Sequence, residues 1–162
     1  MTTDQPHAAR LPPRWFIRFF WALHRAIYRG TGGRLGLRPP TADRWGMLRL
    51  RTVGRRSGTE RVAILGYFED GPDLVTMAMN GWGDPEPAWW LNLQARPDAV
   101  VELVDGARGI RSRAAIGEER ERLWAKWAHY DQGLDDYAAR RSRQTAVVIF
   151  EPRPDVEATP GP

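Results

Sequence analysis

Two adjacent arginines in a glycine-bounded turn are the residues of this 162-residue chain whose types and spacing point most directly to chemistry. The run Gly54-Arg55-Arg56-Ser57-Gly58 separates two strand-like segments, and Arg61 follows it closely. Guanidinium groups are permanently charged forks that match phosphate and carboxylate groups. Glycines let the chain reverse sharply and let its N–H groups approach a ligand. The turn is therefore a candidate anion site, with a solvated hairpin turn as the alternative.

The segments on either side of this turn predict a β-hairpin. Leucine and arginine alternate through residues 48–51, which is the period of a half-buried strand. Residues 61–68 are rich in β-branched and aromatic side chains and form the expected partner strand. The run matches neither the Walker phosphate loop nor the nucleophile elbow. The arginines are thus expected at the tip of a rigid hairpin.

Composition excludes several kinds of catalytic site. The chain has no cysteine, and its three histidines, His7, His24 and His129, share no motif, so we expect no metal site. No serine triad signature is present. The chain is basic, but it contains no known nucleic-acid-binding motif. Eight tryptophans suggest a stacking pocket or a membrane interface. These features favour a protein that binds a flat, phosphorylated cofactor and leaves the difficult chemistry to it.

The N-terminal part of the chain predicts a helix that lies on a membrane surface. Residues 1–13 are expected to be a disordered tail, and residues 14–30 an amphipathic helix. Its four arginines share one face, the other faces are apolar and aromatic, and the segment is too short and too charged to span a bilayer. Packing of this helix on its own domain is the alternative. Residues 31–43 form a linker rich in glycine, proline and arginine.

The rest of the chain predicts a small antiparallel barrel with helices over its openings, within a domain of residues 44–152. Hairpins dominate, and no run of βαβ units is present. Residues 153–162 are expected to be a disordered tail. After the first hairpin we expect strands at 74–79, 98–104, 107–116 and 145–150, and helices at 85–95, 118–130 and 134–141.

Several motifs in order resemble the deazaflavin-dependent nitroreductase and quinone reductase family of actinobacteria. The resemblance covers roughly residues 44–152 and implies a mainly β fold with flanking helices: a split antiparallel β-barrel of the flavin-reductase type, here with an N-terminal amphipathic helix. The matching segments are Leu50–Gly58, Tyr67–Gly71, Pro87–Leu93, Gly117–Trp124 and Val147–Pro152.

The resemblance implies an oxidoreductase that passes a hydride from the reduced deazaflavin coenzyme F-420 to a quinone or a nitroaromatic compound. We also expect a cytoplasmic location, peripheral at the inner face of the cell membrane, with contact through residues 14–29. Because the chain has no known nucleic-acid-binding motif, we expect no nucleic-acid partner. Two alternatives stay open. One is a lipid- or anion-binding module at the membrane surface, and the other is an oxidoreductase that uses flavin mononucleotide (FMN).

Roles for individual residues follow from the same resemblance. The cofactor's phosphate and acidic tail would be held by Arg55, Arg56, Ser57, Gly58 and Arg61. The deazaflavin ring would lie beside Met79, Asn80 and Gly81, with Trp89 nearby. The catalytic residues near the substrate would be Tyr130 and Tyr137. Many members of the family have a lysine where this chain has Asn80.

Overall fold

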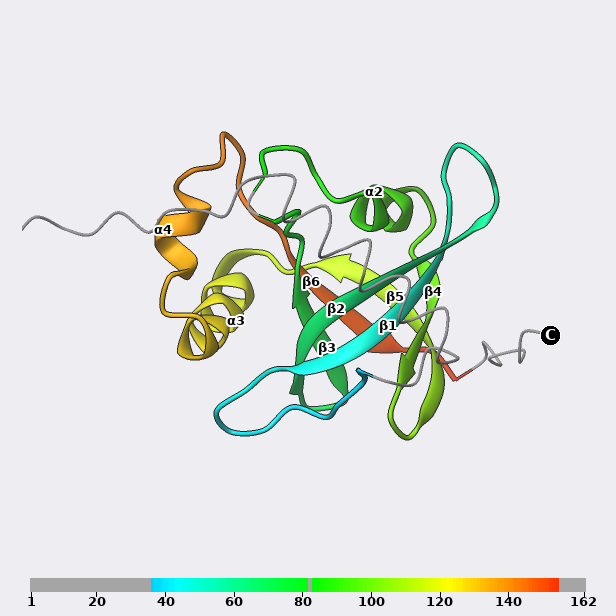
Figure 1. Cartoon of the computed structure of the whole chain (residues 1–162), viewed down its shortest axis with the longest axis horizontal. Coiled ribbons are helices and arrows are strands. Elements are labelled where there is room, and N and C mark those ends of the chain that lie inside the picture. The colour runs from blue at the N-terminus through cyan, green and yellow to red at the C-terminus, as the bar shows by residue number, and fades with distance from the viewer. Residues whose placement is uncertain (1–35, 82, 155–162) are drawn as a thin grey trace, which may run out of the picture. The chain divides into compact units, whose positions relative to one another are not determined.

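Six antiparallel strands close a barrel in the computed structural model, which describes residues 36–81 and 83–154 (Figure 1). The strand order is β1-β2-β3-β6-β5-β4, and pairing of β1 with β4 closes the barrel. The strands are β1 (Gly46–Val53), β2 (Glu60–Asp70), β3 (Asp73–Met77), β4 (Asp98–Leu103), β5 (Gly106–Ala114) and β6 (Val147–Pro152). The helices are α2 (Ala88–Ala95), α3 (Gly117–Tyr130) and α4 (Leu134–Ala138).

The predictions for the two ends of the chain cannot be compared with the structure. The tail 1–13, the helix 14–30, the first part of the linker 31–43 and nearly all of the tail 153–162 lie outside the described residues.

The barrel interior is an apolar core that helix α2 covers. Side chains alternate along β1, where Leu48 and Leu50 are fully buried and Arg49 and Arg51 are not. Trp90 and Leu93 of α2 belong to the same buried cluster, which places this helix over an opening of the barrel as expected. The cluster contains Leu48, Leu50, Tyr67, Leu74, Ala78, Trp89, Trp90, Leu93, Ala99, Val101, Leu103, Ile110, Val148 and Phe150.

A second buried cluster lies on the outer wall of the barrel, under α3. Strand β6 is buried on both faces, because Val148 and Phe150 belong to the interior cluster whereas Val147 and Ile149 belong to the outer one. Leu123 and Trp127, one helical turn apart on α3, pack into this outer cluster. The expectation that all helices cover barrel openings is therefore wrong for α3, which covers a wall.

Element boundaries differ from the predicted ones where prolines and pairing partners decide them. Helix α2 begins at Ala88 rather than at residue 85, because proline disfavours helical geometry in the preceding residue, here Glu86, and Pro87 is itself extended, with a ψ of 140°. Strand β3 ends at Met77, and beyond it a single hydrogen bond from Ala78 N–H to the Ala146 carbonyl (2.9 Å) keeps the chain beside β6.

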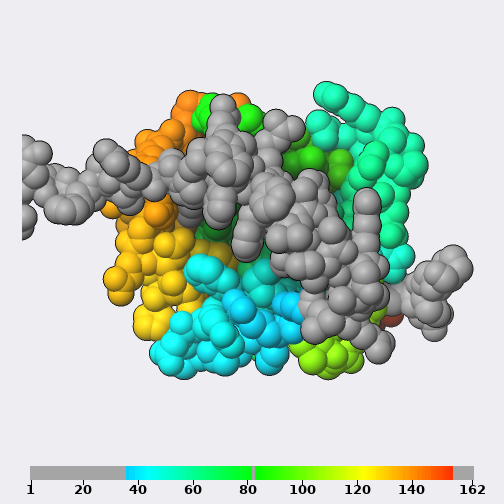
Figure 2. All heavy atoms as spheres, viewed as in Figure 1, coloured from blue at the N-terminus to red at the C-terminus, as the bar shows by residue number. Residues whose placement is uncertain are grey.

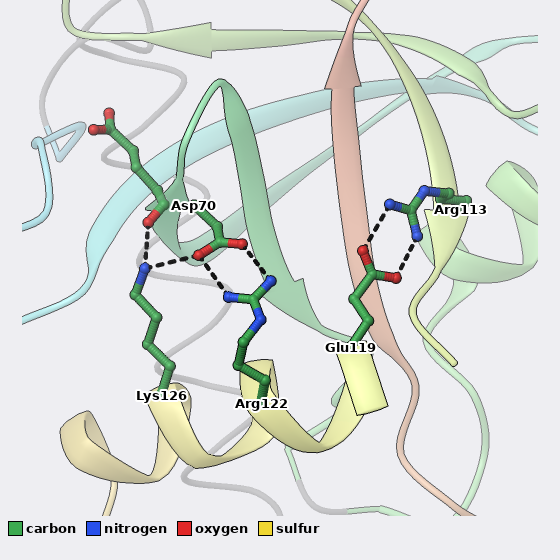
Figure 3. A network of polar contacts seen from close by, with 6 residues as sticks. Asp70, Arg113, Glu119, Arg122 and Lys126 are labelled. Atoms are coloured by element: carbon green, nitrogen blue, oxygen red, sulfur yellow. Dashed lines mark hydrogen bonds and ion pairs between the residues drawn. The ribbon is translucent and has the colours of Figure 1, made fainter. Parts of the chain in front are cut away.

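Charged side chains tie α3 to the barrel wall (Figure 3). Arg122 donates two hydrogen bonds to the Asp70 carboxylate at 3.0 and 2.8 Å, and Lys126 donates a third at 3.1 Å. Nearer the start of the helix, Glu119 accepts two hydrogen bonds from Arg113 of β5, at 2.6 and 2.8 Å. The bonds from Arg122, followed by the one from Lys126, lower the pKa of Asp70 to about 2.

Replacing Asp70 by asparagine is expected to destabilise the protein near neutral pH but not near pH 2. Since the pKa falls from 3.8 to about 2, the stabilisation is complete above the ordinary pKa and is lost as the pH falls through about 2. We expect about 1–2 kcal/mol, less than the full shift implies, because the Arg122 side chain is 56% exposed. Urea unfolding of both proteins across this pH range measures the difference. A difference that persists at the acid end would contradict this assignment.

Candidate functional site

The predicted basic turn forms the tip of the β1–β2 hairpin and stands clear at one side of the barrel unit (Figures 1 and 2). Gly58 N–H donates to the Gly54 carbonyl at 2.8 Å, which closes a single helical turn, and Gly54 N–H donates to the Thr59 carbonyl, also at 2.8 Å. Gly58 has a φ of +68°, and a Cβ on Gly54 would lie 2.7 Å from Ser57 Oγ. Both glycines are therefore needed for this turn.

Three guanidinium groups at the tip have no carboxylate partner in the part of the chain that the structure describes. The nearby Glu60 carboxylate is already engaged, because Arg51 donates two hydrogen bonds to it at 2.9 and 2.7 Å. Neither Arg55 nor Arg56 forms an ion pair with any residue that the structure describes, and Arg61 donates only a 3.4 Å hydrogen bond to Ser57 Oγ. By contrast, carboxylates pair with Arg49, Arg51, Arg108, Arg111, Arg113, Arg122, Arg141 and Arg153.

A buried amide joins the turn to helix α2. Asn92 is 4% exposed, and its Oδ1 accepts a hydrogen bond from the Arg55 backbone N–H at 3.1 Å. Its Nδ2 donates to Thr52 Oγ1 at 3.2 Å, so one side chain holds both the start of the turn and the strand that leads into it. The next two N–H groups of the turn, those of Arg56 and Ser57, meet no acceptor among residues 36–81 and 83–154. Donors and charge at this tip thus suit an anion.

The segment expected beside a cofactor ring follows β3 directly. Met79 is half-buried and packs against the outer cluster, whereas Asn80 and Gly81 are exposed. Gly81 has a φ of +55°, a left-handed conformation that favours glycine. A polar side chain and an open backbone are therefore available at this end of the strand.

Trp89 lies on α2, but its indole belongs to the barrel core. It is 8% exposed and packs against Trp90 with ring centroids 6.3 Å apart. Packing explains its burial, and contact between Trp89 and a cofactor stays a prediction.

The two predicted tyrosines lie on α3 and α4. Tyr130 is half-buried and stacks on Phe68, with ring centroids 6.1 Å apart. Tyr137 is also half-buried, and the Arg140 guanidinium lies over its ring at 5.3 Å. The rings therefore have neighbours that fix their positions.

The candidate segments line up along one edge of the barrel unit. In Figure 1, α4, the loop that precedes α2, α2 itself and the hairpin tip follow one another from left to right. In this view the hairpin tip and α4 lie at opposite ends of the row, with the loop and α2 between them. A hollow of about 220 Å³ beside the hairpin base does not include the loop or Trp89; it is lined by Arg51, Thr52, Val53, Glu60, Asp98, Ala99 and Val100.

Solved structures of similar fold define the class of protein. A structure described as an F420-H2 dependent reductase (FDR-A) is 25% identical, with a TM-score of 0.59, and the match covers 72% of this chain and all of that one. A second, described as a domain-swapped dimer, is 25% identical with a TM-score of 0.63, and the match covers 86% of this chain and all of the other. The fold is thus the split barrel of this class of reductases.

Sequence comparison gives the family. The family model for F420H(2)-dependent quinone reductase matches residues 21–152. An F420H(2)-dependent quinone reductase of Mycobacterium tuberculosis is 34% identical over 135 residues, which cover 81% of this chain and 89% of the relative. The chain therefore belongs to the F420H(2)-dependent quinone reductase family. Membership confirms the resemblance found in the motifs, the oxidoreductase class and the expected dependence on reduced coenzyme F-420.

The residues of the hairpin tip fit the anionic part of this cofactor. Three guanidinium groups without carboxylate partners among the described residues and two backbone N–H groups without acceptors there suit a phosphate-bearing tail. Glycine at both ends of the turn keeps Cβ atoms out of the way.

Proposed function

We propose that this protein passes a hydride from reduced coenzyme F-420 to a quinone, with the cofactor's tail held by the tip of the β1–β2 hairpin. The observation that carries the proposal is the set of three guanidinium groups at the hairpin tip, none of which pairs with a carboxylate of the described residues, whereas eight other described arginines do. Membership of the family supplies the cofactor and the acceptor class. FMN, the alternative cofactor, has no such support.

The tip would bind the tail through charge and oriented donors together. Arg55 and Arg56 would contact the phosphate and carboxylate oxygens, and Arg61, the second residue of β2, would add a third fork from the strand. Ser57 N–H and the small Gly58 would let the oxygens approach the backbone. Because the tip is exposed, salt should weaken this attraction.

The ring would lie along the edge between α2 and the loop after β3. When bound, the reduced deazaflavin supplies the hydride. Met79 would provide an apolar contact to the ring, and the exposed Asn80 side chain and Gly81 backbone would provide polar contacts. Trp89 would act from the core, by fixing the position of α2 beneath the ring.

The acceptor also needs a proton, and Tyr130 or Tyr137 would supply it directly or through water. Replacing Tyr137 by phenylalanine is expected to lower kcat about 10-fold and leave cofactor affinity unchanged. This is less than a dedicated general acid contributes, because water can reach a half-exposed phenol. Steady-state assays with menadione compare this variant with Tyr130→Phe. If both keep full kcat, proton donation by tyrosine is wrong and solvent supplies the proton.

Titration of the purified full chain with reduced coenzyme F-420 tests the proposal directly. We expect saturable binding at micromolar concentrations and oxidation of the bound cofactor when menadione is added. The deazaflavin chromophore without its tail serves as the matched ligand and should bind more weakly, because it cannot use the hairpin tip. An absence of F-420 binding at these concentrations would remove the proposed function.

Two finer predictions concern the acceptor and the membrane. Nitroaromatic acceptors would use the same ring face as a quinone, since both accept a hydride in a flat, conjugated system. No helix in the described part of the chain has the length and apolar character needed to cross a membrane. Peripheral contact with the cell membrane would rest on residues 14–29, which carry the predicted amphipathic pattern.

A further inference from the structure

One buried arginine holds both ends of the loop that precedes α2. The side chain of Arg141 is fully buried, with an exposed fraction of 0%. Its Nη1 donates to the Ala78 carbonyl at 3.2 Å and to Thr145 Oγ1 at 2.7 Å. Its Nη2 donates to the Asp84 carbonyl at 3.3 Å and lies 3.7 Å from Glu86 Oε1. Ala78 begins the loop, and the two acidic residues end it.

These contacts of Arg141 with the two ends of the loop are called the clamp below. The residues that follow Arg141 add further hydrogen bonds to the same ends. Ser142 N–H and Oγ donate to Asp84 Oδ1 at 2.7 and 2.8 Å, which lowers the pKa of that carboxyl group. The Ala146 carbonyl accepts from Ala78 N–H at 2.9 Å. Residues 141–146 therefore touch both ends of the loop and leave Asn80 and Gly81 exposed between them.

This arrangement goes beyond what packing alone requires. Burial of a guanidinium group is costly unless its donors are satisfied. Here Nη1 and Nη2 have acceptors while Nε has none among the described residues, and two of the acceptors are main-chain carbonyls whose positions define the span of the loop. A fork can bridge two carbonyls in a way that a point charge cannot. The Arg141 side chain is thus suited to set the distance between the two ends of the loop.

We propose that Arg141 is a positioning residue that fixes the two ends of this loop, at Ala78 and at Asp84 to Glu86, so that Asn80 and Gly81 are placed to receive the deazaflavin ring. This inference rests on the proposed function. Because α4 ends three residues earlier, the same arginine also links this loop to the helix that carries Tyr137. Arg141 would then act on the ring end of the cofactor, whereas the hairpin tip acts on its tail.

The test uses the full chain and two variants of the clamp. Arg141→Lys keeps the charge but loses the fork. The double variant Arg141→Met with Glu86→Gln removes both buried charges, so that it folds even if one unpaired charge would not be tolerated. Arg143→Ala is the matched control, because Arg143 is an exposed arginine in the same segment.

The first readout is hydrogen exchange of the loop amides, which needs no cofactor. We expect exchange at Ala78 and Gly83 to accelerate about 10-fold in Arg141→Lys, because the lost hydrogen bonds allow the loop to open locally. Exchange in the paired core of β1 should stay as in the wild type. Unchanged loop exchange in both clamp variants would overturn the proposal.

The second readout separates the ring from the tail. In both clamp variants the dissociation constants for F-420 and for its tail-less chromophore should rise by a similar factor, about 10-fold, and Arg143→Ala should change neither. If the wild type binds F-420 and both variants bind it equally well, the positioning role is wrong although the proposed function stands. If the wild type binds no F-420, the proposed function fails and this inference fails with it.

Discussion

Replacing Arg55 and Arg56 together by alanine is expected to weaken binding of coenzyme F-420 about 50-fold, or roughly 2–3 kcal/mol. Each guanidinium group would lose charge-assisted hydrogen bonds to the anionic tail, and neither has a carboxylate partner among the described residues that could offset the change. Both side chains are exposed, so the free energy of unfolding should change by less than about 0.5 kcal/mol. Titration at several salt concentrations measures the effect, and the salt dependence should flatten in the variant.

The matched control is Arg108→Ala, since Arg108 is also exposed and lies near the tip of another hairpin, β4–β5, where it pairs with Asp105. This variant should bind F-420 as the wild type does. Arg55→Lys with Arg56→Lys should give an intermediate affinity, because charge is kept and the fork is lost. Wild-type affinity for F-420 in the double alanine variant would show that the tail binds elsewhere, and the proposed role of the tip would be abandoned.

Local pattern predicted the hairpin that carries these arginines, and its physical basis is simple. Alternation through residues 48–51 assigns leucines to one face and arginines to the other, and Leu48 and Leu50 are indeed fully buried. On the outer face, Arg49 contacts Glu102 at 3.0 Å on the neighbouring strand β4. Strand β4, by contrast, lies far from β1 along the chain, and no local sequence pattern predicts that the two strands pair.

The helix that packs on the outer face of β6 could not be predicted from local sequence pattern. A continuous apolar run predicted a buried strand, and the strand is buried on both faces. What it could not predict is the occupant of the outer face, because any amphipathic helix with apolar residues one turn apart would fit. Leu123 and Trp127 decide this through the tertiary fold, which places α3 on the wall.

The two residues that organise the candidate site were missed for different reasons. Asn92 had a usable signal: it is a polar residue inside the apolar run of α2, between Trp90 and Leu93, and a buried amide requires partners. Arg141 had none, because it stands among other arginines in a polar segment. Only the long-range contacts to Ala78 and Asp84 distinguish it.

Exposed and buried polar groups have different roles along the edge of the barrel. The tip presents exposed charge, which gives affinity but little geometric restraint. Buried amide and guanidinium groups lie behind the tip and behind the loop after β3, and they restrain the backbone rather than meeting a ligand. Asn92 is therefore the residue that should connect stability of the fold with affinity for the cofactor's tail.

Replacing Asn92 by alanine is expected to destabilise the protein by about 2 kcal/mol and to weaken F-420 binding about 10-fold. The change leaves the Arg55 N–H without its 3.1 Å acceptor, removes the 3.2 Å bond to Thr52 and frees the turn to move away from α2. Urea unfolding and cofactor titration measure the two effects. The affinity for the tail-less chromophore should stay unchanged, because that ligand does not reach the tip.

Gln94→Ala is the matched control for this change, since Gln94 is an exposed amide on the same helix and should affect neither quantity. Thr52→Val removes the second partner of Asn92, and its combination with Asn92→Ala should cost less than the sum of the two single changes, because both remove the same bond. Additive costs would show that the two side chains act independently. If Asn92→Ala shows the expected destabilisation but no change in affinity for the cofactor's tail, Asn92 has only a packing role. The glycines alone would then fix the position of the tip.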